Sequence, residues 1–248
     1  MAAEAPERVR ELPWSEQIVW ACANGSDECL DRISGILSPK SLTNRERVAV
    51  VLAALRAERK AAATLFAVDD DGFLAELLHS EDSDVDAFRW ILASFGEAKL
   101  FRALVPAAGR SEFLVRAAKR NQASHLQQIS RLFRSLKSTV SQEDARRYRE
   151  CAWDALQEAL FAGSVVAADT LMTDRGFLNG VTVVRGRRDN DGPPIMHPDE
   201  IAETLIALKK KESFDWVLKR WNDVIFQLDN DKLCLKALCL LYGRAYFS

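Results

Sequence analysis

The sequence lacks long apolar runs, and neither sign of charge prevails in it. No part of the 248-residue chain is an uninterrupted apolar run of about 18 residues, the length that a membrane-spanning helix needs. The first residues, MAAEAPERVRELPW, are charged and hold no apolar segment of the kind found in secretory signal peptides. We therefore expect a cytoplasmic protein without a membrane span, acting in its own cell or, as an effector, in a host cell.

Positive and negative charges nearly cancel. The 34 Lys and Arg residues stand against 36 Asp and Glu residues, which leaves a formal net charge of −2. This balance excludes a protein whose whole surface holds nucleic acid or anionic membrane, and it leaves only a local patch for such a partner. We therefore expect a protein partner rather than nucleic acid.

Signatures of catalysis and of metal binding are missing as well. The chain contains no GxGxxG, GxxxxGK[ST], GxSxG or HExxH motif. Its histidines lie far apart, and none has a Cys, His or carboxylate at a ligand spacing such as i+4. We expect no metal and no cofactor, and we expect His125 to be a partly buried, hydrogen-bonded residue.

Cysteines are few, odd in number and without CxxC spacing, and each lies in an apolar, helix-like context. Reduced, buried thiols are the simplest interpretation. The five are Cys22, Cys29, Cys151, Cys234 and Cys239.

Helical periodicity is what the sequence has in abundance. Apolar residues recur at i, i+3, i+4 and i+7 in segments such as NRERVAVVLAALRAERK and EDARRYRECAWDALQEALFAG. Helix-start signals precede them at Thr43, at Ser141 and at Pro198. Only GVTVVRG, residues 180–186, has a β-like composition. The pattern predicts an all-α protein.

One unit returns along the chain. Small or apolar residues end a first helix, a turn position follows, and four residues later a second apolar stretch begins. Successive turn positions are separated by 26 to 48 residues. They are Gly25, Ala57, Ser83, Asn121, Gly163 and Lys211. Small residues let the second helix pack closely on the first, and such hairpins must stack because one alone cannot bury both faces.

The segments ALFAGSVVAADTLM (159–172) and ACANGSDECLDRI (21–33) carry a resemblance to a known family. Their A-A-x-x-G…V-V-x-x-L-L register is similar to the helical part of ankyrin repeats, over about residues 15–225. The T-P-L-H opening of those repeats and their regular period of about 33 residues do not occur here. The resemblance implies a solenoid of about six stacked helical hairpins whose concave surface binds other proteins. Another helical solenoid and a non-repeat helical domain remain open.

In this interpretation residues 1–14 are a flexible lead, and residues 15–248 form one helical repeat domain. A helix over residues 232–248 caps the stack. Residues 180–198 form one long irregular loop, because they hold three of the chain's eleven glycines and three of its seven prolines. Such a loop either contacts a partner or is a solvated insertion. We expect a monomer; self-assembly through the final segment LCLKALCLLYGRAYF is a weaker possibility.

Charge is distributed in blocks. Residues 61–88 hold eight acids and no Lys or Arg, whereas residues 113–142 hold six bases and no acid. Either the runs are solvated helix faces, or they form a bipolar surface that steers one partner into register. Within the first block Asp69–Asp71 precede a glycine, and we expect Asp71–Gly72 to close a hairpin with its acids solvated.

Trp216 and Trp221 are five residues apart, so we expect one of them to face outward beside Lys219 and Arg220 as an interaction anchor. The expected partner-binding residues are Asp82, Asp84, Asp86, Arg116, Lys119, Arg120, Arg185, Arg187, Arg188, Trp216 and Trp221. The leading functional hypothesis is a non-catalytic protein-interaction module: an adaptor, an inhibitor or an effector-type binder. The alternative is a small helical enzyme or toxin-like modifier whose site is assembled from dispersed carboxylates and arginines, such as Asp84, Asp86, Arg185 and Arg187.

Overall fold

The computed structural model describes residues 13–25, 42–107, 109–136, 138–174, 177, 198–220 and 240–242. Within those residues all regular structure is helical, with twelve helices and no strand. The all-α prediction is therefore confirmed. The expected loop at 180–198, with its β-like start, lies outside the described residues, apart from Pro198. So do nearly all of the expected lead and of the capping helix.

The chain divides into two compact units, Met1–Pro106 and Ala107–Ser248. The expectation of one repeat domain over residues 15–248 stays a prediction.

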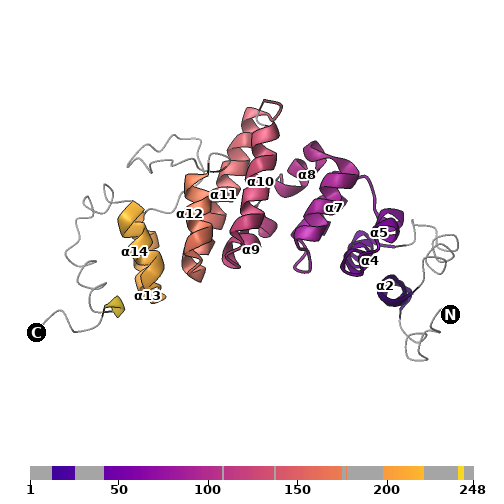
Figure 1. Cartoon of the computed structure of the whole chain (residues 1–248), viewed down its shortest axis with the longest axis horizontal. Helices are drawn as coiled ribbons and strands as arrows, with labels where there is room; N and C mark the ends of the chain where they lie inside the picture. Colours follow the sequence, from indigo (N-terminus) through magenta and orange to yellow (C-terminus); the bar gives the residue numbers. More distant parts are fainter. Residues whose placement is uncertain are drawn as a thin grey trace, which may run out of the picture. The chain divides into compact units, whose positions relative to one another are not determined.

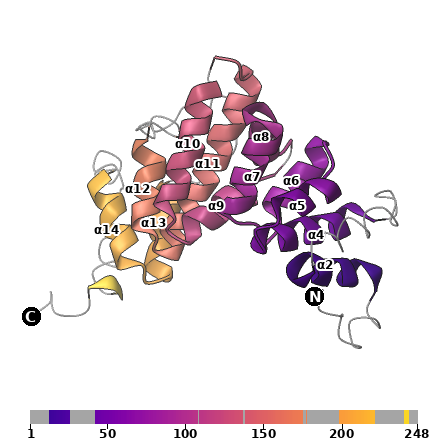
Figure 2. The same ribbon diagram turned by 45° about the vertical axis from the view of Figure 1, so that its right-hand side comes forward.

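Unit 1 holds six of the described helices. Along the chain α2 packs on α4, α4 on α5, α6 and α7, and α8 on both α6 and α7. Their order in space can be followed in Figure 2. The helices are α2 (Trp14–Asn24), α4 (Asn44–Arg56), α5 (Lys60–Phe66), α6 (Asp71–His79), α7 (Val85–Phe95) and α8 (Glu97–Leu104).

Unit 2 holds the other six as three consecutive hairpins. The first helices form one row, α9 on α11 and α11 on α13, and the second helices form another, α10 on α12 and α12 on α14. Figure 1 shows α12 between α10 and α14. The helices are α9 (Glu112–Lys119), α10 (Ala123–Leu136), α11 (Gln142–Ala162), α12 (Val165–Thr173), α13 (Pro198–Ala207) and α14 (Lys211–Arg220).

The predicted helix starts are confirmed. Thr43 forms a full capping box with Glu46, in which each side chain satisfies the other's backbone N–H. Ser141 accepts a hydrogen bond from the Asp144 N–H at 3.0 Å. Helix α13 begins at Pro198, where the missing N–H costs nothing.

The expectation that Asp71–Gly72 closes a hairpin is wrong. Asp70 is the N-cap of α6, where its carboxylate accepts a hydrogen bond from the Phe73 N–H at 2.9 Å. Asp71 and Gly72 therefore belong to the first turn of a helix. An Asp-rich stretch suits a helix start and a turn equally well. The apolar run that follows Gly72 decides in favour of the helix start, because Phe73 and Leu74 are fully buried.

Four hairpins share one turn. In each, the residue with positive φ donates its N–H to the carbonyl three residues back, and the next residue donates to the carbonyl five back. This is the Schellman pattern that ends helices on a left-handed residue. The left-handed residues are Glu58, Asn121, Gly163 and Lys209.

Four of the six predicted turn positions lie within two residues of these. Asn121 and Gly163 are confirmed as the left-handed residues themselves. The expected position Ala57 is one residue early, and Lys211 is two residues late because it already begins α14. The turn at Ser83 has another form, closed by its N–H to the Ser80 carbonyl.

Small residues line the helix contacts in unit 2, as the hairpin argument requires. Ala118, Ala159 and Ala168 have no exposed surface, so the backbones of neighbouring helices approach closely. Larger side chains fill the remaining space. Tyr148 is fully buried, with its ring stacked 4.2 Å from that of Phe133.

The turns of unit 2 are bonded to one another in sequence. The Asn121 side chain accepts a hydrogen bond from the Ala167 N–H at 2.9 Å, and the Ser164 hydroxyl donates to the Lys119 carbonyl at 2.7 Å. In the next step Lys210 donates to the Ala162 carbonyl at 3.1 Å. Ser164 makes no cap bond within its own helix. The Asn121 side chain, from the preceding hairpin, therefore satisfies a backbone N–H in the first turn of α12.

Candidate functional site

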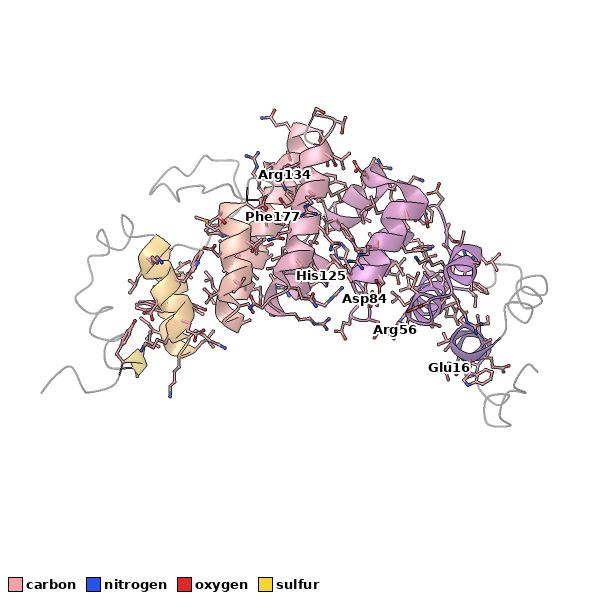
Figure 3. The ribbon with its side chains drawn as sticks, viewed as in Figure 1. Glu16, Arg56, Asp84, His125, Arg134 and Phe177 are labelled. Carbon is pink, nitrogen blue, oxygen red and sulfur yellow. The ribbon has the colours of Figure 1, made fainter. Side chains whose placement is uncertain are left out.

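The three acids predicted to bind a partner have local roles in unit 1. Asp82 forms an ion pair with Arg56 at 2.7 Å. Asp84 is the N-cap of α7 and accepts hydrogen bonds from two backbone N–H groups. Asp86 lies 3.6 Å from Arg89. Figure 3 labels Arg56 and Asp84. All three acids are exposed, so these contacts weaken their charge toward a partner without hiding it.

Bases from outside the acidic block neutralise much of the rest. Lys99 pairs with Asp69, and Arg102 pairs with Asp71 at 2.8 Å. Both bases belong to α8 and lie 30 and 31 residues after the acids with which they pair. The exposed acids of the block that neither pair with a described base nor cap a helix are Glu76 and Glu81. The acidic patch is therefore much weaker than its composition indicates.

Of the three predicted basic residues between positions 116 and 120, two also have contacts within unit 2. Lys119 forms an ion pair with Glu158 at 2.7 Å. The Arg116 guanidinium lies 6.0 Å from the centre of the Phe113 ring, which is within cation–π range. Arg120 ends α9 in the hairpin turn and is exposed. Among the described residues no carboxylate pairs with Arg120.

Glu158 is the centre of a charged cluster on the row of first helices. It accepts from Lys119 and, at 2.9 Å, from Arg110. Burial alone would raise the pKa of Glu158, but these two cations lower it below its ordinary value. For the neighbouring Asp154, burial raises the pKa and outweighs the opposite effect of Arg110. The cluster holds its cations in place through an ionised Glu158.

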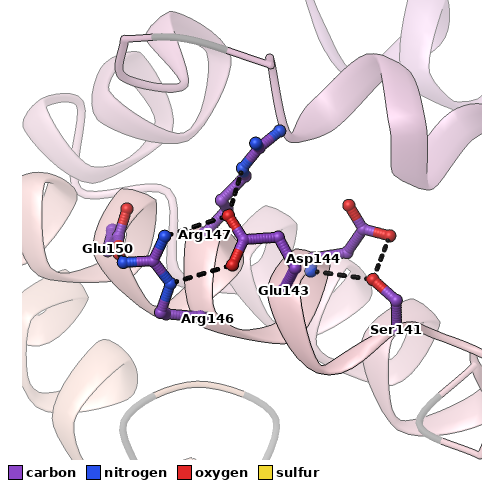
Figure 4. Close-up of polar contacts among 6 residues, drawn as sticks. All are labelled: Ser141, Glu143, Asp144, Arg146, Arg147 and Glu150. Atoms are coloured by element: carbon purple, nitrogen blue, oxygen red, sulfur yellow. Dashed lines mark hydrogen bonds and ion pairs between the residues drawn. The ribbon is translucent and has the colours of Figure 1, made fainter. Parts of the chain in front are cut away.

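A second set of ion pairs runs along the start of α11 (Figure 4). Glu143 accepts from Arg146 at 2.9 Å and from Arg147 at 3.1 Å, and Arg146 also lies 3.2 Å from Glu150. The hydrogen bond from Arg146, ahead of the charge of either arginine, lowers the pKa of Glu143. These pairs are spaced three or four residues apart and stabilise one long helix.

Helix α10 presents exposed cations that pair with no acid in the part of unit 2 that the structure describes. Arg131 and Arg134 are exposed, and in the described structure neither contacts a carboxylate. Ser124 and Gln127, both exposed, continue the same face toward the start of the helix. Figure 3 labels His125 near the start of α10 and Arg134 near its end. We define the α10 basic face as Ser124, Gln127, Arg131 and Arg134.

Sequence reasoning counted Arg131 and Arg134 in the basic block but did not select them as binding residues. The available signal was their spacing. Positions 124, 127, 131 and 134 recur at helical intervals and alternate with the buried positions of the same helix. Those buried residues are Leu126, Ile129, Leu132 and Phe133.

Trp216 is not an exposed anchor, since only 7% of its surface is exposed and its indole N–H donates to Asp169 at 3.2 Å. It packs α14 on α12. The other tryptophan of that prediction, Trp221, lies outside the described residues. The same holds for Arg185, Arg187 and Arg188 of the expected loop.

Histidines and thiols behave as structural residues. His125 is half-buried and lies 3.0 Å from the Gln122 side-chain oxygen, as predicted. Cys22 and Cys151 are buried and free, and burial raises the pKa of each thiol to about 11. In the described part of the chain no three His, Cys, Asp or Glu side chains converge as metal ligands would.

Comparison with known proteins found no relative: no family model, no curated protein and no solved structure matches the chain. No described helix is long and apolar enough to span a membrane.

Proposed function

We propose that the protein is a non-catalytic protein-interaction module, an adaptor, inhibitor or effector-type binder built from ankyrin-like helical hairpins. One observation carries the proposal. The three hairpins of unit 2 pack first helix on first helix and second on second, and each turns through a left-handed residue with the same two backbone hydrogen bonds. Arrays of this kind bury one face of each unit against its neighbours and leave extended helix surfaces for partners.

The same turn in unit 1, at Glu58 between α4 and α5, supports extending the repeat beyond unit 2. The turn bonds of Asn121, Ser164 and Lys210 add rigidity, because each hairpin end is tied to the next. A rigid surface loses little conformational entropy when it binds, and this favours specific recognition. A concave surface over about six hairpins is the complete form of this proposal.

Charge supplies the recognition in this proposal. Among the described residues, the basic side chains on α10 and in its turn pair with no acid, whereas most of the acidic block is already paired within unit 1. We therefore place the partner contact chiefly on the basic side of the predicted bipolar surface. Unmatched surface charge of one sign raises association rates and selects for partners of the opposite sign.

Affinity capture followed by a purified binding assay tests the function. The full chain is cross-linked in native or host lysate at low and high salt, captured proteins are identified, and one is purified for calorimetry. The test variant is R120E/R131E, which reverses two cations that pair with no described acid. The matched control is R45E/R149E, which makes the same change in net charge at two other exposed arginines.

Lys119 and Arg116 are poor choices for this test. Reversing Lys119 places a second acid beside Glu158, and Arg116 lies against the Phe113 ring, so a lost partner would be confused with lost stability. Saturable, salt-sensitive binding of one protein that R120E/R131E weakens and the control does not is the expected result. If no purified candidate binds a well-folded chain, the interaction proposal is wrong.

A further inference from the structure

The α10 basic face is a continuous strip of hydrogen-bond donors. From Ser124 to Arg134 it rises about 15 Å along the helix, enough to cover several residues of a bound peptide. All four of its side chains are exposed or half-exposed, while the opposite side of α10 is packed in the core of unit 2. Arg120, in the turn before α10, adds a third cation without a described acid.

Several other arginines are already paired within the chain. Arg56, Arg102, Arg110 and Arg146 each pair with a carboxylate of the same unit. Arg131 and Arg134 are one turn apart on the same helix, so their like charges repel. A carboxylate from outside the chain would relieve that repulsion and accept two parallel hydrogen bonds from a guanidinium.

A second copy of the chain is a poor occupant. Most acids of its own acidic block already have a partner within the chain. Asp69, Asp71 and Asp82 are paired with bases, and Asp84 caps α7. Within that block, the exposed acids that have no described partner are Glu76 and Glu81. The occupant must bring its own negative charge.

Nucleic acid fits less well than an acidic protein. Single strands are held by stacking on exposed aromatic rings, but the aromatic residues of this region, Phe113 and Phe133, are only 5% and 8% exposed. Duplex binders rely on many phosphate contacts, roughly 6–10, whereas the face with its turn offers Arg120, Arg131 and Arg134.

We propose that the α10 basic face binds an acidic, carboxylate-rich peptide segment of a partner protein. Arg131 and Arg134 hold its carboxylates, and Gln127 and Ser124 hydrogen-bond the adjoining peptide. The inference rests on the proposed interaction function and names the surface and the chemistry that it uses.

Fluorescence anisotropy of a labelled octaglutamate peptide tests this proposal on the full chain, at 50 and 300 mM NaCl. The variant R131Q/R134Q keeps side-chain length but removes both charges, and R45Q/R149Q is the charge-matched control. Far-UV circular dichroism confirms that both are folded. An octaglutamine peptide checks that binding needs carboxylates, and a labelled single-stranded DNA and a labelled duplex replace the peptide in parallel.

We expect saturable binding of octaglutamate that falls at the higher salt and is about 2- to 30-fold weaker in R131Q/R134Q, the sum of two exposed ion pairs. The control variant should bind like the wild type. A single variant, R134Q, should give a smaller loss in the same direction.

Three results would overturn the inference: no saturable binding of the peptide, equal losses in the two double variants, or tighter binding of either DNA with the same dependence on Arg131 and Arg134. The proposed function fails separately. If a purified partner binds wild type and R131Q/R134Q equally, the interaction module stands and this surface assignment falls. If octaglutamate binds as expected but no protein partner does, the surface assignment stands and the interaction module falls.

Discussion

Asn121 joins two hairpins of unit 2 through one side chain, and replacing it tests whether the turns are coupled. Its carboxamide oxygen accepts the hydrogen bond that an N-cap would normally take from Ala167. Its backbone has φ of +56°, a region that asparagine tolerates better than most residues. Three substitutions separate these roles: Asn121→Gly, Asn121→Ala and Asn121→Asp.

The expected costs follow from the burial of Ala167, which has no exposed surface. Asn121→Gly leaves that N–H without its acceptor, for a loss of about 1–2 kcal/mol in the free energy of unfolding. Asn121→Ala adds left-handed strain and should cost about 1 kcal/mol more. Asn121→Asp keeps an acceptor and puts negative charge near the start of α12, so its stability should stay within about 0.5 kcal/mol of the wild type.

Urea unfolding followed by circular dichroism gives the free energies, and hydrogen exchange read by mass spectrometry localises the change to the first turn of α12. Glu58→Gly is the control. It relieves a φ of +59° in unit 1, where the Glu58 side chain makes no polar contact with a described residue, and it should stabilise by about 0.5–1 kcal/mol. Equal destabilisation by Asn121→Ala and Asn121→Asp, with unchanged exchange in α12, would refute the coupling of the turns.

Three further outcomes are expected. Gly163→Ala should lower the free energy of unfolding by about 1 kcal/mol, measured by urea titration, because φ is +88° there and the nearest atoms belong only to the flexible Lys210 side chain. Asp154→Asn should raise the urea midpoint at pH 7: the folded state raises the pKa of Asp154 above 3.8, so its ionised form costs stability, and the gain should vanish as the pH falls below that value. A gain independent of pH would contradict this. Cys22 and Cys151, whose pKa is about 11, should resist iodoacetamide at pH 8 in the folded chain and react fully in urea, as peptide mapping would show.

Much of the local structure could be predicted from the sequence. Thr43 and Ser141 begin helices because their hydroxyls reach a backbone N–H three residues on, which is a purely local event. Asn121 and Gly163 turn the chain for a similar reason, since few other residues accept positive φ. Where local signals are ambiguous, prediction failed: Asp71–Gly72 fits a turn and a helix start alike.

The charged surface was less predictable than the helices. Residues 61–88 look uniformly acidic in sequence, yet Asp69 and Asp82 meet bases 30 and 26 residues away. The sequence pattern allows Trp216 to face inward or outward. In the structure its indole N–H bonds to Asp169, and this contact places it against α12. Ion pairs between residues so far apart depend on how the helices pack, and the periodicity of the sequence does not predict that packing.

The sequence by itself determined that the chain forms helices, where most of them begin and where two of the turns fall, because capping and positive φ depend on a few neighbouring residues. Only the tertiary structure decided which charges cancel and which face outward. Arg56 and Arg102 meet carboxylates only when their helices pack together, whereas α10 packs so that Arg131 and Arg134 meet none among the described residues. The basic face proposed for binding is thus a product of packing, since a charge is available to a partner only when the fold brings no opposite charge beside it.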